Sequence, residues 1–165
     1  MTSDTQKLHM MAASISLEQA EEIVASALAA ASRIGTAPMA VAVLDAGGHL
    51  VAFKRQDGLA FLRCEIAQGK AWTALAMGTS SRGSRDRLAQ RPAFSNALSA
   101  LSQGRFIPVP GGVLILDAEK RVIGAVGMSG DASDKDEACC IEAIRAAKLI
   151  PYPEEPAPGW QDALQ

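Results

Sequence analysis

The sequence predicts an α+β protein in which helices pack on an antiparallel sheet. Two stretches share one frame: LDAGGHLVAF at residues 44–53 and LDAEKRVIGAV at residues 116–126. Each has the pattern of a strand, a tight turn and a returning strand, and hairpins pair their strands antiparallel. Segments with helical spacing lie before, between and after the two hairpins, so helices are expected to cover the sheet.

The first helix is predicted to begin at Leu17. Ser16 and Gln19 have the spacing of a capping box, and apolar residues then recur at helical spacing until Gly35. The first hairpin follows at residues 38–57. Its first strand is apolar on both faces, which is typical of a strand covered on both sides, so we expect this hairpin to lie centrally.

The region between the hairpins is predicted to be mainly helical. Residues 62–77 have a helical composition despite Gly69, and residues 84–101 predict one or two short helices interrupted at Pro92. A short extra strand is expected at residues 106–109.

The second hairpin is predicted from residues 111–117 and 121–130, and a final helix from residues 131–150. The acidic start of this helix suits the positive end of its dipole. The Pro-rich residues 151–165 cannot continue the helix. We expect them to lie over the surface or against a neighbouring subunit, with Trp160 as an anchor.

Length and composition predict one domain, residues 15–150, between a flexible tail at 1–14 and the Pro-rich tail at 151–165. A net charge of −2 and 4% aromatic residues argue against a nucleic-acid partner. Three cysteines form no disulfide framework or metal knuckle, and we find no signal peptide or membrane span. These features predict a soluble cytoplasmic protein without a membrane partner.

The hairpins, GKAWTA in the second helix, PVPGG and SDKDEACC together resemble the GlcG/HbpS-like family, which includes the carboxy-terminal domain of PduO-type adenosyltransferases. The resemblance implies a profilin-like sandwich on a five-stranded antiparallel sheet, homo-oligomers and, for some members, binding of haem or a corrinoid. It implies no single activity, because members are linked to haem sensing, haem breakdown and small-molecule catabolism.

Lys70 is the most informative candidate for a functional site. On a helical wheel of residues 61–77 it falls on the apolar face, with Arg63 beside it. The structural interpretation is that its amine reaches water or a carboxylate such as Asp57 or Asp136. The functional interpretation is that it binds an anionic ligand or, with a lowered pKa, acts as a base or nucleophile.

Arg55 and Asp57 follow the second strand and lie two residues apart, on one face. Arg55 could grip a carboxylate, and Asp57 could hold Lys70 or accept a proton. An exposed strand end with solvated charges is the alternative. We expect both residues to converge on Lys70 from the first hairpin.

Glycines at the ends of the second hairpin suggest close approach of a ligand to the backbone. Gly111 and Gly112 start one strand, and Ser129 ends the other, where N–H groups could form an anion site. A simple bulge is the alternative. The acidic run that contains Asp136 is predicted to cap the last helix rather than bind a metal, and Asp136 stays a pocket candidate through the resemblance.

Neither histidine is a convincing haem ligand, because His49 flanks a turn and His9 lies in the predicted tail. Haem would need an unusual ligand such as Met, Cys, Thr or Lys, or none. The adjacent Cys139 and Cys140 are predicted core residues, and no nucleophilic dyad is apparent.

Two classes of function remain. The preferred one is a binding protein for a small, anionic molecule, either haem or another tetrapyrrole or an organic acid. The alternative is a cofactor-independent enzyme of organic-acid catabolism that uses Lys70 with Asp57 and Arg55. Trp72 is predicted to point away from the apolar face of its helix, which indicates a homo-oligomer interface.

Overall fold

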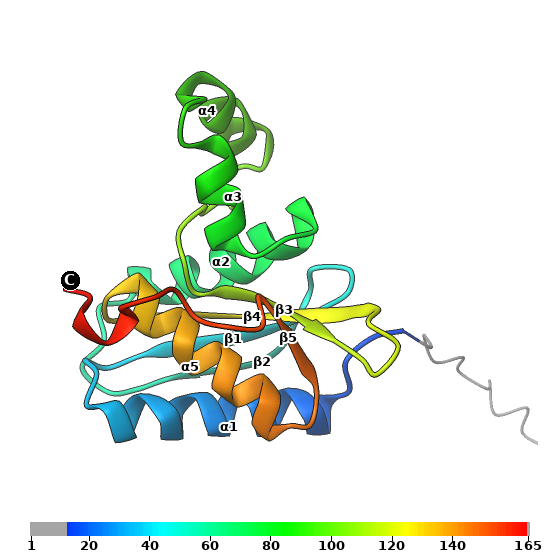
Figure 1. Ribbon diagram of the computed structural model, residues 1–165, viewed down its shortest axis with the longest axis vertical. Coiled ribbons are helices and arrows are strands. Elements are labelled where there is room, and N and C mark those ends of the chain that lie inside the picture. The colour runs from blue at the N-terminus through cyan, green and yellow to red at the C-terminus, as the bar shows by residue number, and fades with distance from the viewer. Residues whose placement is uncertain (1–12, 165) are drawn as a thin grey trace, which may run out of the picture.

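The computed structural model describes residues 13–164. The fold is α+β, as predicted, with one five-stranded antiparallel sheet (Figure 1). The elements, in chain order, are α1 (Leu17–Ile34), β1 (Ala40–Asp45), β2 (Leu50–Arg55), α2 (Leu62–Met77), α3 (Ser81–Leu88), α4 (Pro92–Leu101), β3 (Gly112–Leu116), β4 (Val122–Ser129), α5 (Ser133–Ala146), β5 (Ile150–Tyr152) and the short 3₁₀ helix η1 (Trp160–Asp162).

The strand order is β2-β1-β4-β3-β5, so the two predicted hairpins meet through β1 and β4. The first hairpin is therefore not central as a whole: β1 is an inner strand, whereas β2 forms one edge. β1 is buried along almost its entire length, and β2 is partly exposed. The apolar character of residues 40–44 thus correctly predicted that β1 is an inner strand, but it did not determine whether β2 is an inner or an edge strand.

The fifth strand does not form at residues 106–109, where the sequence predicted it. These residues are a loop, because the N–H of Phe106 bonds to the Ser102 hydroxyl, the N–H of Ile107 bonds to the Thr73 hydroxyl, and Pro108 has no N–H. The fifth strand is β5, which pairs with β3 at the other edge of the sheet. An edge position tolerates the proline in this strand.

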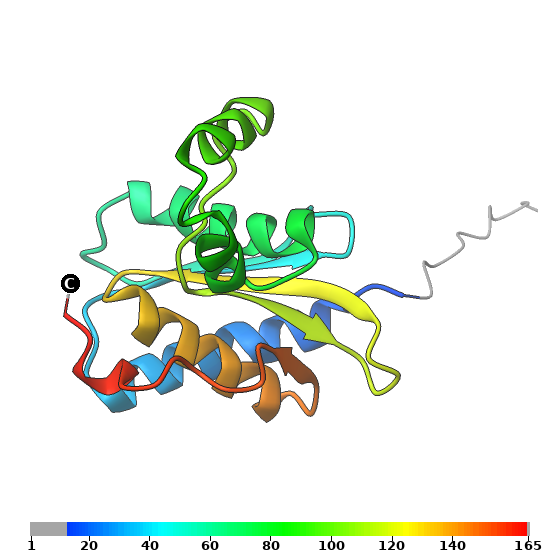
Figure 2. The same cartoon turned by 45° about the horizontal axis from the view of Figure 1, so that its top comes forward.

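Helices cover both faces of the sheet. Helices α1 and α5 pack side by side on one face, and α2 packs on the other (Figures 1 and 2). The larger apolar core lies under α1 and α5, and two smaller clusters lie under α2. Helix α1 begins at the predicted capping box of Ser16 and Gln19 and ends at Gly35.

Two glycines let α2 lie unusually close to the sheet. A Cβ on Gly127 would lie 2.0 Å from the carbonyl oxygen of Ala67, and a Cβ on Gly112 would lie 2.1 Å from that of Lys70. Neither position can hold a side chain without moving the helix. The sheet therefore meets the backbone of α2, and the middle of that helix is fixed against β3 and β4.

The repeated LDA frame produces the same turn twice. In each hairpin the aspartate, Asp45 or Asp117, accepts hydrogen bonds from the N–H groups two and four residues later. The fourth residue of each turn, Gly48 or Lys120, has a positive φ. The shared sequence is thus a turn motif, and it accounts for the similarity of the two hairpins.

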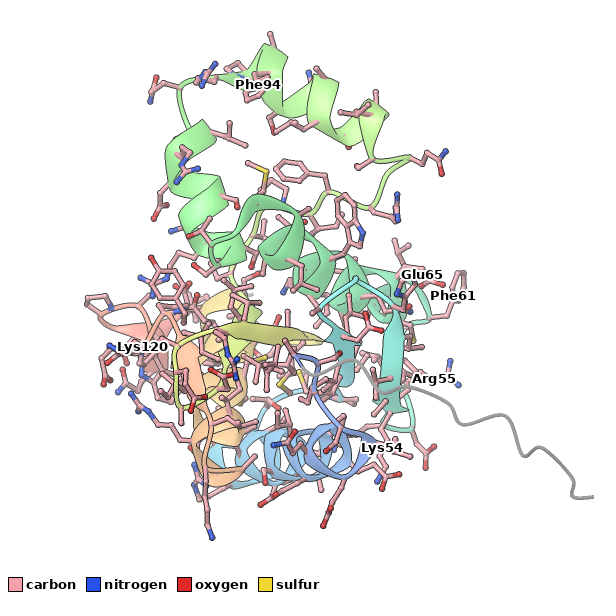
Figure 3. The ribbon with its side chains drawn as sticks, turned by 90° about the vertical axis from the view of Figure 1, so that its right-hand side faces the viewer. Lys54, Arg55, Phe61, Glu65, Phe94 and Lys120 are labelled. Carbon is pink, nitrogen blue, oxygen red and sulfur yellow. The ribbon has the colours of Figure 1, made fainter. Side chains whose placement is uncertain are left out.

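Helices α3 and α4 form an arm on the α2 side of the sheet (Figure 1). The predicted break at Pro92 is confirmed, since Pro92 starts α4. No residue of α4 is fully buried. Phe94 lies on this arm, away from the sheet, as Figure 3 shows.

The segment after β5 returns over α5 of the same chain. Arg145 donates to the carbonyl of Glu154 and contacts the carboxylate of Glu155, and Arg82 donates to the Glu155 carbonyl. Trp160 lies in a hollow beside α1 and α5. Trp160, the predicted anchor, therefore contacts helices of its own chain.

Most of the predicted tail at 1–14, His9 included, lies outside the described residues. None of the helices within 13–164 is long and apolar enough to cross a bilayer.

Candidate functional site

A buried ion pair joins α2 to α5. The Lys70 ammonium lies 2.7 Å from the carboxylate of Asp136, and the two side chains are 1% and 0% exposed. The other carboxylate oxygen accepts the N–H of Asp131 at 3.4 Å. Of the two partners considered for Lys70, the fold selects Asp136.

The backbone of Gly111 covers this ion pair. Its φ is +114°, and a Cβ there would lie 2.9 Å from Nζ of Lys70 and 3.0 Å from Cβ of Asp136. The next residue, Gly112, packs on the Lys70 carbonyl and donates its N–H to the Ser81 hydroxyl at 2.8 Å. The space that these glycines leave is filled by protein, which is a different use from the ligand contact that the sequence suggested.

Burial dominates the chemistry of the pair. It raises the pKa of Asp136 to about 6, although the attraction of Lys70 and the hydrogen bond from its ammonium pull in the opposite direction. An ammonium held by a buried carboxylate is not a free base or nucleophile. Lys70 could react with a ligand only if the pair opened.

A second buried pair, which sequence reasoning missed, lies next to the first on α5. Glu137 is fully buried, and its carboxylate oxygens lie 3.1 and 2.9 Å from Nε of Arg82 on α3. Burial raises the pKa of Glu137, and Arg82 opposes this shift. The sequence did contain one indication of this pair, because two acids, Asp136 and Glu137, stand next to each other near the start of α5. Consecutive residues of a helix point in different directions, so each acid needs its own partner when both are buried.

A pocket of about 410 Å³ lies at the start of α5, and we call it the α5 pocket. Its wall includes Arg63 from α2, Arg85 from α3, the turn residue Asp131 and the first helical residue Ser133; the chain end adds Ala163 and Leu164. No side chain caps α5 at Ala132. Two cations thus share this pocket with the positive end of a helix.

The predicted site residues divide into two groups. The first group is the buried core beside the α5 pocket, formed by Lys70, Asp136, Gly111 and Gly112. Arg63 and Ser129 belong with it: Arg63 lies in the wall of the α5 pocket, and its guanidinium is 3.4 Å from the hydroxyl of buried Ser129.

Arg55 and Asp57 form the other group, and the expected convergence on Lys70 is not found. Ala40 pairs with Arg55 on one side and with Ser129 on the other, so Arg55 lies two strands away from Ser129, on the edge strand. Both residues line a separate hollow with Pro38. Figure 3 shows Arg55 at the outer edge of the sheet.

Trp72 is half-buried rather than exposed. Its ring packs near the apolar cluster under α2, and the guanidinium of Arg105 lies over it at 4.5 Å. The premise of the predicted oligomer interface at Trp72 is therefore wrong. The homo-oligomer itself stays a prediction.

A family model described as haem degrading protein HbpS-like matches residues 15–145. The chain belongs to this HbpS-like family. An uncharacterized 15.0 kDa protein from the dhaT–dhaS intergenic region of Citrobacter freundii is 30% identical over 124 residues, which cover 75% of this chain and 85% of that protein. The corrinoid adenosyltransferase PduO of the same organism is 27% identical over 138 residues, which are 84% of this chain but 40% of PduO.

Several solved structures share the fold. The complex of PduOC with haem has a TM-score of 0.73 at 25% identity and covers 82% of this chain and 96% of that one. HbpS has a TM-score of 0.66 at 26% identity, with 89% and 96% covered. Protein ORFY of Klebsiella pneumoniae has a TM-score of 0.74 at 25% identity, with 87% and 97% covered.

The α5 pocket contains arginines, which suit a carboxylate, but no usual ligand for the iron of a haem. Its described lining residues include no His, Cys or Met. The His49 side chain is 82% exposed on the first hairpin, beside Asp45. Cys139 and Cys140 are buried, and burial raises the pKa of Cys139 to about 12, so neither thiol is available as a thiolate ligand.

Proposed function

We propose that this HbpS-like protein binds a carboxylate-bearing small molecule in the α5 pocket, with haem or a related tetrapyrrole as the first candidate. One observation carries the proposal: two arginines, Arg63 and Arg85, line the pocket into which an uncapped helix amino terminus opens. The haem complex of PduOC supports the choice of candidate. A haem propionate is a carboxylate that a guanidinium can bind through two hydrogen bonds.

Two aspartates, Asp131 and Asp134, also line the pocket, and Asp131 has partners of its own. The carboxylate of Asp131 already accepts the N–H groups of Ala37 and Ala132 and lies 3.8 Å from the ammonium of Lys135. Among residues 13–164, by contrast, Arg85 contacts only the neighbouring Asp86, at an exposed site. The guanidinium of Arg85 can therefore exchange a solvated partner for a ligand at little cost.

Binding without turnover is the function that the geometry supports best. An enzyme that used Lys70 with Asp57 and Arg55 would need these groups together, and they lie in separate places. An acid–base role would instead fall to Lys70 and Asp136, which are closed off by Gly111. We expect a bound ligand to be recovered chemically unchanged after long incubation, as chromatography of the extracted ligand would show.

Haem and metal-free protoporphyrin IX are expected to bind with similar affinity, because the pocket supplies no iron ligand. The dimethyl ester of protoporphyrin, which has no free carboxylates, is expected to bind more weakly. Absorbance titrations of the three compounds would measure both differences. Much tighter binding of haem than of protoporphyrin would show that the iron is ligated and would contradict our assignment.

Arg85→Gln is expected to weaken haem binding by about 1.5–3 kcal/mol, roughly 10- to 150-fold, which is the range for a hydrogen bond to a charged group. Arg87→Gln is the matched control, since Arg87 is exposed on the same helix and does not line the pocket. Equal affinity of the two variants would remove the α5 pocket from the proposal. A panel of small organic acids in thermal-shift assays would test the ligand class if porphyrins fail.

We also propose that the protein is a homo-oligomer, as the family resemblance implies. Light scattering should then give a mass that is a multiple of the 17.2 kDa of one chain. A monomer mass at micromolar concentration would refute this proposal without affecting the pocket.

A further inference from the structure

We propose a second binding site, beside α2 between that helix, the first hairpin and residues 103–105, for a planar aromatic molecule that has a carboxylate at one end and an N–H or O–H donor at the other. The site is a pocket of about 330 Å³, called here the α2 pocket, and it includes Leu44, Leu50, Glu65, Gln68, Trp72 and Arg105. It shares no residue with the α5 pocket. The inference goes beyond the function proposed above and does not depend on it.

Gly69 explains how the two sides of the α2 pocket come together. Glycine inside a helix costs about 1 kcal/mol relative to alanine, so its presence in α2 needs a reason. A Cβ at Gly69 would lie 2.5 Å from Cγ1 of Ile107 and 3.1 Å from the carbonyl oxygen of Arg105. The glycine lets residues 105–107 lie directly on α2, and this contact places Arg105 beside Trp72.

The guanidinium of Arg105 is held in place before any ligand arrives. Its centre lies 4.5 Å from the centre of the Trp72 ring, and its Nε donates to the carbonyl of Ser102 at 3.0 Å. Within residues 13–164 its terminal nitrogens and the indole N–H of Trp72 have no hydrogen-bond partner. A fixed guanidinium with free terminal donors is suited to a carboxylate.

The rest of the pocket favours a flat, apolar body. Leu44 is buried and Leu50 is 51% exposed, so Leu50 offers apolar surface that no other part of the described chain covers. The stacked indole and guanidinium present planar groups, which interact best with another planar π system. The hairpin backbone approaches closely, because a Cβ at Gly48 would lie 3.3 Å from Cδ1 of Trp72.

The spacing along α2 sets the length and polarity of the ligand. Glu65 and Trp72 are seven residues apart, which is two helical turns or about 10 Å along one face. Arg105 stands at the Trp72 end, and Glu65 stands at the other, on the face of α2 that Figure 3 shows toward the solvent. The Glu65 carboxylate has no cation partner among the described residues and can accept from a donor on the ligand. A fused two-ring acid has the required size.

Indole-5-carboxylate carries both groups at opposite ends of two fused rings and is the probe for this site. Titration into ¹⁵N-labelled protein should shift the indole N–H resonance of Trp72 and the amides of residues 46–50 and 103–107. The resonance of Trp160, identified with Trp160→Phe, should not move. Naphthalene-2-carboxylate lacks the donor and indole lacks the carboxylate, and each should bind at least 5-fold more weakly.

Arg105→Gln should lower the affinity for indole-5-carboxylate at least 10-fold, whereas Arg87→Gln, at an exposed position that lines neither pocket, should leave it unchanged. Glu65→Gln should reduce the preference for indole-5-carboxylate over naphthalene-2-carboxylate, which a merely structural role of Glu65 would not do. Unperturbed spectra of the free variants would establish that they fold. The proposal is overturned if Arg105→Gln binds as the parent does, if the shifts fall at the α5 pocket, or if no probe shifts Trp72 at millimolar concentration. Failure here would leave the porphyrin titrations of the α5 pocket untouched.

Discussion

Lys70→Met is expected to destabilise the protein by about 3–5 kcal/mol at pH 8, the usual cost of removing one partner from a buried ion pair. The methionine fits the space of the lysine stem, but the Asp136 carboxylate is then left fully buried without its cation. Urea denaturation would measure the loss. Lys54→Met on the exposed edge strand β2 is the matched control and should cost less than about 0.5 kcal/mol.

The stability lost in Lys70→Met, measured as free energy of unfolding, should become smaller as the pH falls. Burial raises the pKa of Asp136 to about 6, above the value of about 3.9 expected in the unfolded chain, so the Asp136 carboxyl group binds its proton more tightly in the folded state. The contribution of Asp136 to stability is then fully present below pH 4 and is lost as the pH rises through 6. Removing Lys70 raises the pKa of Asp136 further, and the difference between variant and parent therefore grows from pH 5 to pH 8.

The double variant Lys70→Met with Asp136→Leu separates the ion pair from packing. It removes both charges, so it should recover much of the stability lost in the single variant. An unchanged midpoint for Lys70→Met at pH 8, or a double variant no more stable than the single one, would show that the pair does not carry the energy we assign to it.

Gly127→Ala is expected to cost about 3 kcal/mol or more, at the upper end for overpacking in a core. The new methyl would lie 2.0 Å from the carbonyl oxygen of Ala67 and 2.8 Å from the backbone nitrogen of Ala71. Both contacts are with helix backbone, which cannot rotate away as a side chain can. Helix α2 must therefore shift as a unit, and urea denaturation would report the cost.

Gly47→Ala is the matched control for Gly127→Ala. Its methyl would lie 3.0 Å from Nδ1 of His49, but that side chain is 82% exposed and free to move. The expected cost is below about 1 kcal/mol. A similar cost for both variants would show that the approach of α2 to β4 is not tight in solution.

The parts of the fold that could be predicted are those specified by neighbours in sequence. The capping box at Ser16, the helix break at Pro92 and the two turns closed by Asp45 and Asp117 each depend on residues within five positions. The order of strands depends instead on contacts between distant segments. The first hairpin was accordingly recognised but placed too centrally.

The candidate site shows the same division. Helical periodicity placed Lys70 on the inner face of α2, and it is buried there. Leu62, the first residue of the same helix, is 60% exposed, so the burial does not extend to the start of α2. The partner of Lys70 is 66 residues away, and both Asp57 and Asp136 were compatible with the pattern. Only the packing of α5 on the sheet, which brings Asp136 to Lys70, decides between the two aspartates.

The chain end that borders the α5 pocket lies outside the family-matched residues 15–145. Arg145 and Arg82 hold the returning segment through Glu154 and Glu155, upstream of the pocket. Substitutions at Ala163 or Leu164 thus alter one wall of the pocket without touching a strand. A change at either position would therefore test whether the ligand preference of the proposed site can be altered while the five-stranded sheet stays the same.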